Sequence, residues 1–126
     1  MDLLDTQIYS LIGADGFARL VAAFYKRVAS DEILGPLYPP HDMSGAESRL
    51  REFLIQRFGG PDDYSRRRGH PRLRMRHAHF PVTQAARDRW VSLMDQALAE
   101  ARFSAPIEQM LRAFFADAAT FLINAK

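Results

Sequence analysis

Apolar residues recur at helical spacing in four segments of the chain, and none of these segments alternates apolar and polar residues as a half-buried strand would. The first segment, residues 15–30, carries five apolar side chains on one helical face: Phe17, Leu20, Val21, Phe24 and Val28. The last segment runs from Ser104 to residue 122 and has the clearest stripe, with Pro106 in its first turn. The pattern therefore predicts an all-α fold.

Local signals place the ends of the other two helices. Ser44 and Glu47 have the spacing of a capping box, and the run of residues 59–61, Gly-Gly-Pro, ends the helix that follows. The third helix starts after Pro81 with Thr83 as its cap. Its apolar face consists of Ala86, Trp90, Leu93, Met94, Ala97 and Ala101.

Two segments between the helices lack a helical period. Residues 31–40 predict a short helical turn from Asp31 and then an extended corner at Tyr38-Pro39-Pro40. Residues 59–80 are mostly irregular, with room for one short helix from Arg72 to Ala78. An irregular segment of this length is unusual in a compact domain and is usually functional.

Composition supports one folded domain over residues 1–126, because 48% of the residues are hydrophobic and nine are Phe. The chain has no Cys, which excludes disulfides, thiolate zinc sites and Cys nucleophiles. No apolar run approaches the roughly 20 residues that cross a bilayer, and the N-terminus has acids where a signal peptide has basic residues. We expect a soluble cytoplasmic protein that does not bind membranes.

Positive charge is concentrated in one stretch. The chain has 17 basic and 15 acidic residues, yet no acidic residue lies between Tyr64 and Phe80. That stretch holds six arginines: Arg66, Arg67, Arg68, Arg72, Arg74 and Arg76. A nucleic-acid-binding protein more often carries a basic excess over a whole face, so this stretch indicates a site for one small anion or a solvated loop.

The same stretch contains His77. If residues 72–78 are helical, Leu73 lies one turn before His77 on the same side, and the imidazole faces the interior. Both a hydrogen-bonded core histidine and a metal ligand agree with that placement. A zinc site with His79 does not, because side chains two positions apart on a helix diverge by about 200°. Haem agrees better, since its iron takes one imidazole and its propionates take arginines.

The motifs "RFGGPDDYSRRRGHPRLRMRHAHF" and "RDRW", with "FYKRVASDE" and "LYPPHDMSGAESRLREFL" upstream, resemble the truncated haemoglobins, and among them group II. The resemblance runs from about Ile8 to Phe121. It implies a globin-like two-over-two helical sandwich with a short first helix and an irregular proximal loop. Two features depart from the family pattern: "GADG" replaces adjacent glycines between the first two helices, and His79 stands where relatives often have Pro.

The resemblance also implies a role for particular residues. His77 would be the axial ligand of the iron of haem b, with its second ring nitrogen donating to a backbone carbonyl, for which Leu73 is the candidate. The residues around a bound diatomic gas would be Tyr25, Tyr38 and Trp90. The other haem contacts would be Ala46, Arg49, Tyr64 and Arg76, with Arg49 and Tyr64 at the propionates.

Three functions remain open on the sequence alone. The first is reversible binding of O2, NO and CO at a five-coordinate haem iron, with slow release of O2 because the three aromatic side chains can donate hydrogen bonds. The second is a haem enzyme that consumes NO or reduces peroxide and depends on an unknown reductase. The third is a basic module without haem, in which residues 66–68 grip phosphates. The chain would act as a monomer or homodimer.

Overall fold

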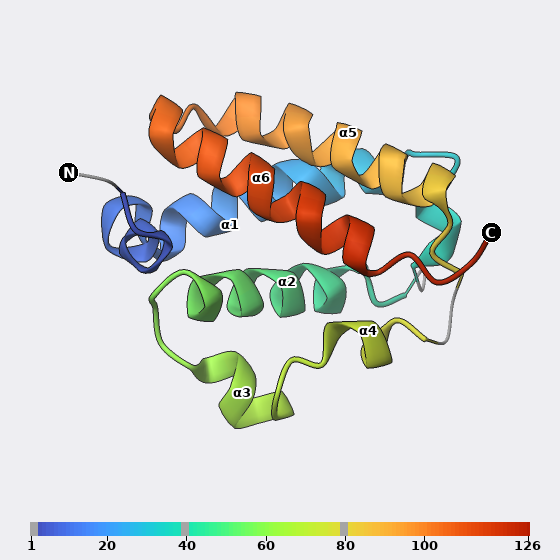
Figure 1. Ribbon diagram of the computed structural model, residues 1–126, viewed down its shortest axis with the longest axis horizontal. Coiled ribbons are helices and arrows are strands. Elements are labelled where there is room, and N and C mark those ends of the chain that lie inside the picture. The colour runs from blue at the N-terminus through green and yellow to red at the C-terminus, as the bar shows by residue number, and fades with distance from the viewer. Residues whose placement is uncertain (1–2, 39–40, 79–80) are drawn as a thin grey trace.

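The computed structural model describes residues 3–38, 41–78 and 81–126, and every regular element in those ranges is helical (Figure 1). The α-helices are α1 (Ile8–Ala29), α2 (Met43–Arg57), α3 (Asp63–Arg68), α4 (Leu73–Arg76), α5 (Gln84–Ala101) and α6 (Ala105–Phe121). Two 3-10 helices, η1 (Asp5–Gln7) and η2 (Gly35–Leu37), complete the set. The all-α prediction is confirmed.

Four long helices form two packed pairs. α1 packs against α2 and α5, and α5 packs against α6. In Figure 1, α5 and α6 run side by side, α1 lies behind them, and α2 lies below with α3 and α4 beneath it. This arrangement is the two-over-two sandwich that the sequence predicts.

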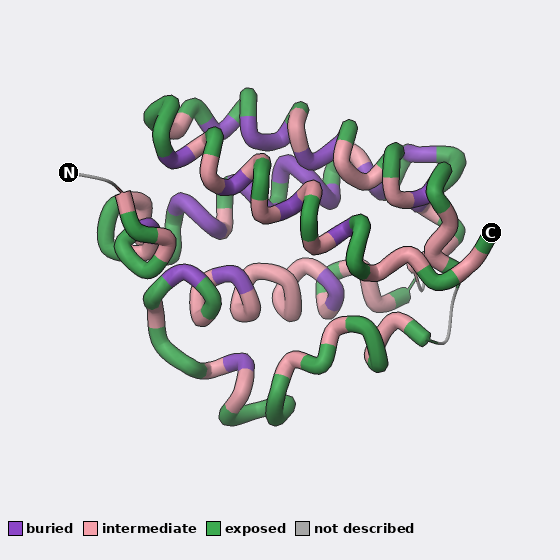
Figure 2. The backbone as a smooth tube through the Cα atoms, in the orientation of Figure 1, coloured by how far each residue is buried: buried purple, intermediate pink, exposed green. Residues whose placement is uncertain are grey.

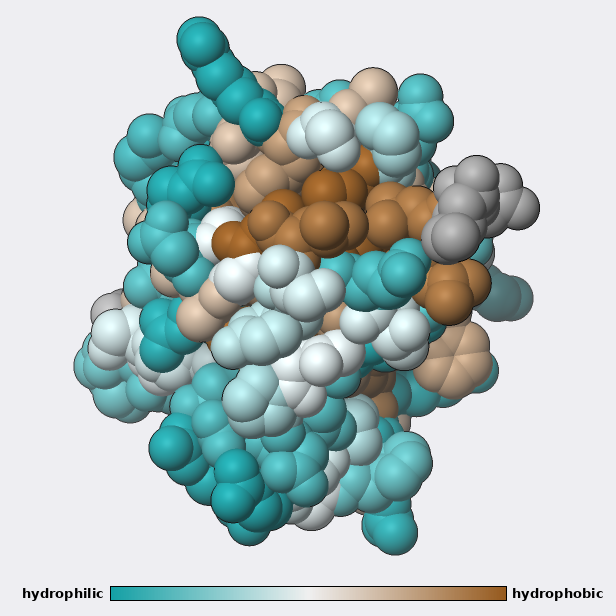
Figure 3. Space-filling view, turned by 90° about the vertical axis from the view of Figure 1, so that its left-hand side faces the viewer, coloured by the Kyte–Doolittle hydropathy of each residue, from teal (hydrophilic) through white to brown (hydrophobic). Residues whose placement is uncertain are grey.

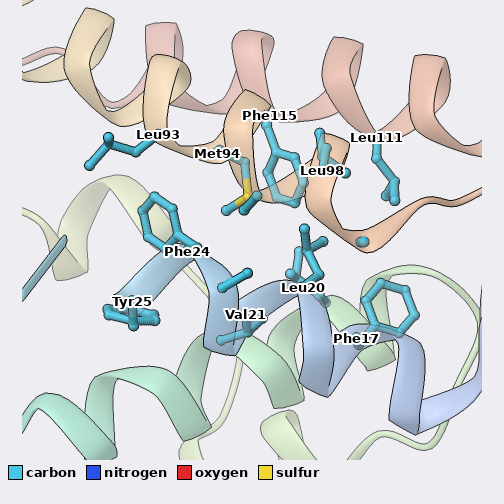
Figure 4. Close-up of a cluster of buried hydrophobic side chains, with 14 of the residues drawn as sticks. Phe17, Leu20, Val21, Phe24, Tyr25, Leu93, Met94, Leu98, Leu111 and Phe115 are labelled. Carbon is cyan, nitrogen blue, oxygen red and sulfur yellow. The ribbon is translucent and has the colours of Figure 1, made fainter. Parts of the chain in front are cut away.

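The core lies where α1 meets α5 and α6 (Figures 2 and 4). All five residues of the stripe in 15–30 have no exposed surface. They pack against Met94, Leu98 and Phe115, which come from the opposite pair of helices (Figure 4). The α6 stripe is buried at Ile107, Leu111 and Phe115 and only partly buried at Met110, Phe114 and Ala118. At its end Phe121 is 58% exposed, although the pattern placed it on the core face.

α1 contains the predicted break between a short first helix and a long second one. Gly13 has φ 69° and ψ 177°, which is a non-helical conformation inside the element. Glycine reaches positive φ without the steric cost of a Cβ. The turn at "GADG" therefore needs one glycine in this position, and a second adjacent glycine is not required.

The helix starts agree with the sequence in two of three cases. Thr83 caps α5, with its Oγ1 accepting from the Ala86 N–H at 3.1 Å, and α6 follows Ser104 with Pro106 in its first turn. The capping box at Ser44 is wrong. α2 begins at Met43 after Asp42, and the first helical hydrogen bond already runs from the Ala46 N–H to the Asp42 carbonyl.

The connecting segments differ in how well they were predicted. The turn before the corner is present as η2, and Tyr38 is extended as expected, whereas Pro39 and Pro40 lie outside the described residues. The segment 59–80 holds two helices and not one. α3 was missed because it is six residues long and buries only Tyr64, so it leaves no apolar period. α4 is shorter than predicted and starts after Arg72, which has φ 41°.

The molecular surface has an apolar patch at the N-terminal end. Figure 3 shows apolar side chains gathered there, with hydrophilic residues below, where α3 lies in Figure 1. Leu4 and Leu11, at this end of the chain, are each 60% exposed. No helix in the described ranges combines the length and apolar character needed to cross a membrane.

Candidate functional site

A cavity of about 550 Å³ opens between α2, α4, α5 and the end of α6. All eight residues that the sequence assigned to the site line this cavity: Tyr25, Tyr38, Ala46, Arg49, Tyr64, Arg76, His77 and Trp90. They come from both halves of the chain, so only the fold brings them together. Most of the remaining lining is aliphatic or aromatic, as in pockets that bind a large apolar ligand.

His77 follows α4 directly as its C-cap residue and is partly buried. Its Nδ1 lies 2.7 Å from the carbonyl oxygen of Leu73, which confirms the predicted contact. Because a carbonyl only accepts, Nδ1 is the donor and the lone pair of the neutral ring is on Nε2. An imidazole in this tautomer is suited to bind a metal through Nε2.

The backbone of His77 is held by the C-terminal segment. The side-chain amide of Asn124 donates to the His77 carbonyl at 3.1 Å, and its oxygen accepts from the Val82 N–H at 2.7 Å. The Asn124 N–H donates in turn to the Val82 carbonyl at 2.9 Å. Asn124, which follows the end of α6, therefore links His77 at the end of α4 to Val82 before the start of α5.

The opposite wall of the cavity is aromatic. The Tyr25 and Tyr38 rings meet edge to face with centroids 5.6 Å apart, and the Phe24 ring packs against Trp90 at 5.0 Å. Burial raises the pKa of the Tyr25 hydroxyl, and the neighbouring Tyr38 adds to the effect. Burial also raises the pKa of Tyr38. Both phenols therefore keep their protons at neutral pH and remain hydrogen-bond donors.

The polar groups of this wall gather around Tyr38. The Trp90 indole and the Tyr25 hydroxyl face the Tyr38 oxygen and lower its pKa against the larger effect of burial. Each of the three groups carries one proton that it can donate. Three donors thus lie within reach of one another beside the cavity.

The residues that the resemblance assigned on α2 and α3 lie at the cavity. Ala46 is 6% exposed and Tyr64 is 4% exposed, and both line the cavity. Arg49 is partly exposed at the rim, where its guanidinium binds the Asp42 carboxylate at 3.1 Å. The Tyr64 ring packs edge to face on Phe53 with centroids 5.7 Å apart. Buried apolar walls and a cation at the rim suit a flat ligand with acidic edge groups.

Arg76 lines the cavity as predicted, but its guanidinium mostly binds backbone. It donates to the carbonyls of Pro71 at 2.6 Å, Arg68 at 2.6 Å and His70 at 3.1 Å. It also lies over the Tyr64 ring, 5.7 Å from the centroid. Arg76 therefore holds the α3–α4 connection together, a role that the sequence did not indicate.

Two further arginines line the cavity and were not assigned to it. Arg68 is the last residue of α3, and it alone of the three consecutive arginines reaches the cavity. Arg87 on α5 also lines it, but its guanidinium is bound to Thr120 and Ala116 of α6. The run of arginines indicated positive charge near the site, but it did not indicate which of the three would line the cavity.

Comparison with known proteins agrees with this geometry. A model of the bacterial-like globin family matches residues 7–124. The group 2 truncated hemoglobin YjbI of Bacillus subtilis is 38% identical over 103 residues, which cover 82% of this chain and 77% of that protein. The chain belongs to the group II truncated haemoglobins.

Solved structures of related haemoglobins superpose on this truncated haemoglobin closely. The hemoglobin of the thermophilic bacterium Chloroflexus aurantiacus has a TM-score of 0.89 and 45% identity, covering 93% of this chain and 97% of that one. The truncated oxygen-avid haemoglobin of Bacillus subtilis has a TM-score of 0.87 and 35% identity, covering 92% and 98%. The predicted globin fold is therefore confirmed.

Membership in this family implies haem-based binding of diatomic gases. The residues present fit haem on three observations: a cavity of about 550 Å³ with mainly apolar walls, an imidazole with Nδ1 committed to a carbonyl, and arginines at the rim. Haem needs an apolar enclosure for the macrocycle, a nitrogen ligand for the iron and cations for the propionates. This truncated haemoglobin supplies all three.

Proposed function

We propose that this chain binds haem b in the cavity through His77 and reversibly binds O2, NO or CO on the aromatic side. The observation that carries the proposal is that His77 and the three aromatic donors line one cavity, although they come from four separate segments of the chain. When bound, haem would supply an iron that can take a diatomic gas as a ligand. Everything else in the function depends on the protein's own side chains.

On the proximal side, His77 would bind the iron through Nε2. The Leu73 carbonyl, 2.7 Å from Nδ1, fixes the orientation of the ring. Arg49 and Arg68 lie at the rim, where their planar guanidinium groups can bind propionate carboxylates. Tyr64, which lines the same cavity, would donate its hydroxyl to these groups.

On the distal side, Trp90, Tyr25 and Tyr38 would donate hydrogen bonds to a ligand that gains negative charge. A hydrogen bond to a charged acceptor contributes roughly 1.5 to 3 kcal/mol, which slows ligand release by about tenfold or more for each bond. We therefore propose slow release of O2. The related Bacillus subtilis protein is oxygen-avid, which supports this direction.

The test is a haem titration of the purified protein followed by optical absorption. The wild-type protein should develop a Soret band at one haem per chain, and His77→Gly should lose the spectrum of histidine-ligated ferrous haem. Added imidazole should restore that spectrum in His77→Gly, because it replaces the deleted ligand.

His70→Gly is the matched control, since His70 lies in the same connection but is exposed and does not line the cavity. This variant should keep the wild-type spectrum. A wild-type chain without a Soret band, or a His77→Gly spectrum identical to that of the wild type, would overturn the proposal.

A further inference from the structure

The arginines between α3 and α4 differ in whether a carboxylate neutralises them. Arg66 pairs with Asp62 and Asp63, and Arg67 pairs with Glu52. Within the described part of the chain, no carboxylate lies within ion-pair distance of Arg68, Arg72 or Arg74. These three exposed arginines are called the basic face below.

The basic face borders the opening of the cavity. Arg68 lines the cavity itself and also a second depression of about 510 Å³ that is lined by residues of α2, α3 and α4. Arg72 precedes α4 and Arg74 lies within it, in the same short segment as Leu73, Arg76 and His77, which line the cavity. Uncompensated positive charge thus lies beside the cavity that would hold the proposed cofactor.

The remainder of the chain has the opposite charge. Outside residues 64–80 there are eleven basic and fifteen acidic residues. The charge is therefore unevenly distributed along the chain, with the positive excess in the segment that contains α3 and α4. An asymmetry of this kind speeds the encounter with an oppositely charged partner and favours one orientation on approach.

We propose that the basic face is the docking surface for an acidic electron-carrier protein that reduces the haem iron. The inference rests on the proposed function, because it requires haem in the cavity. One electron passes from the reduced carrier to the ferric iron, so the carrier is oxidised by one electron, the iron becomes ferrous, and no atom is transferred. Electron transfer weakens steeply with distance, so a donor must dock where the cofactor edge is accessible.

Nucleic acid fits the same surface less well. Binding to a phosphate backbone draws on a basic stripe that neutralises many phosphates, and its affinity grows with each one. Here the basic face has three uncompensated arginines in a chain whose other residues are net acidic. Attraction to a compact acidic protein requires only a local field, which these three provide.

The experiment measures how fast a reduced acidic flavodoxin, used as the probe, converts the ferric haem-loaded protein to the ferrous CO form under anaerobic conditions. Arg72→Glu/Arg74→Glu tests the basic face, since neither residue lines the cavity. The control is Arg19→Glu/Arg102→Glu, which changes the net charge equally. Arg102 lies at the α5–α6 junction, at the far end of the molecule from α4 (Figure 1).

At low ionic strength the basic-face variant should be reduced about tenfold more slowly than the wild type, and the control should keep most of the wild-type rate. The difference should shrink at high salt, where the Debye length falls to about 3 Å. With the cation hexaammineruthenium(II) as donor, the order of the rates should reverse.

Two results would overturn the proposal. One is that flavodoxin reduces both double variants equally slowly. The other is an unchanged flavodoxin rate together with lost binding of a double-stranded DNA oligonucleotide, which would assign the face to nucleic acid. A normal Soret band and normal CO binding in all variants separate these failures from a failure to bind haem.

Discussion

The buried carboxylate of Asp31 allows a direct test of what attaches the turn before Tyr38 to α5. Its side chain is 2% exposed, and it is the only charged residue that is buried among those the structure describes. Oδ2 accepts from the N–H groups of Ile33 and Leu34 at 3.0 and 2.9 Å, and Oδ1 binds Arg89 of α5 at 2.5 Å. Asp31 thus joins α5 to the turn that leads to Tyr38.

Asp31→Asn keeps the size of the side chain but removes its charge. Hydrogen bonds to a charged group contribute roughly 1.5 to 3 kcal/mol each, whereas neutral ones contribute about 1 kcal/mol. The Arg89 side chain is 46% exposed, so solvent screens its share of the ion pair to below about 1 kcal/mol. We expect a loss of about 2 kcal/mol in the free energy of unfolding, or a Tm lower by roughly 8 °C.

The effect should depend on pH in one direction. Burial raises the pKa of Asp31, but hydrogen bonds from Leu34 and Arg89 outweigh it, so the pKa is below its ordinary value. A carboxyl with a lowered folded-state pKa stabilises the protein above its unfolded pKa of about 3.9 and loses that contribution as the pH falls through the folded value. The difference in the free energy of unfolding between wild type and variant should be largest at neutral pH and should disappear in acid.

Thermal unfolding followed by circular dichroism measures this gap. Asp15→Asn is the control, because Asp15 is 89% exposed and pairs with Arg19 one turn along α1. Its Tm should stay near the wild-type value. Equal Tm values for Asp31→Asn and Asp15→Asn at neutral pH, or an Asp31→Asn deficit that does not narrow in acid, would refute the reasoning.

Three more predictions concern the site and the backbone around it. Trp90→Phe should release O2 about tenfold faster in stopped-flow displacement by CO, because the ligand loses one hydrogen bond, and an unchanged rate would exclude the indole as a donor. Asn124→Ala should transfer haem faster to an excess of apomyoglobin, because it removes the side-chain hydrogen bond to the His77 carbonyl, whereas a wild-type transfer rate would count against that role. Gly59→Ala should lower the Tm more than Gly69→Ala. Both glycines have positive φ, but only at residue 59 would a Cβ overlap the backbone of a neighbouring segment.

The four long helices could be predicted because each carries apolar residues at helical spacing. The stripe of residues 15–30 is fully buried, and the α5 start at Thr83 is where its cap signal placed it. The start of α2 was misplaced because two candidate caps lie close together. Asp42 precedes Ser44 by two residues, and a local motif does not show which of them the preceding corner will place at the helix end.

The site residues could be named from the sequence only through the resemblance to a family. Spacing alone placed His77 on the inner side of a short helix, and the structure agrees, but a core histidine would give the same pattern. Trp90 and Tyr25 likewise occupy apolar faces where any large residue would pack. Arg66, Arg67 and Arg68 cannot be told apart by residue type. Only Arg68, the last residue of α3, lines the cavity.

The proximal connection could not be predicted because side-chain contacts to backbone hold it, and these leave no periodic pattern. Arg76 binds three carbonyls, and Asn124 reaches back 47 positions to His77 and 42 to Val82. None of these bonds requires a ligand in the cavity. The imidazole is therefore oriented by the chain itself, so haem binding need not pay the entropic cost of ordering its own ligand. This preorganisation explains how a connection with almost no apolar core of its own can hold a metal ligand in a defined position.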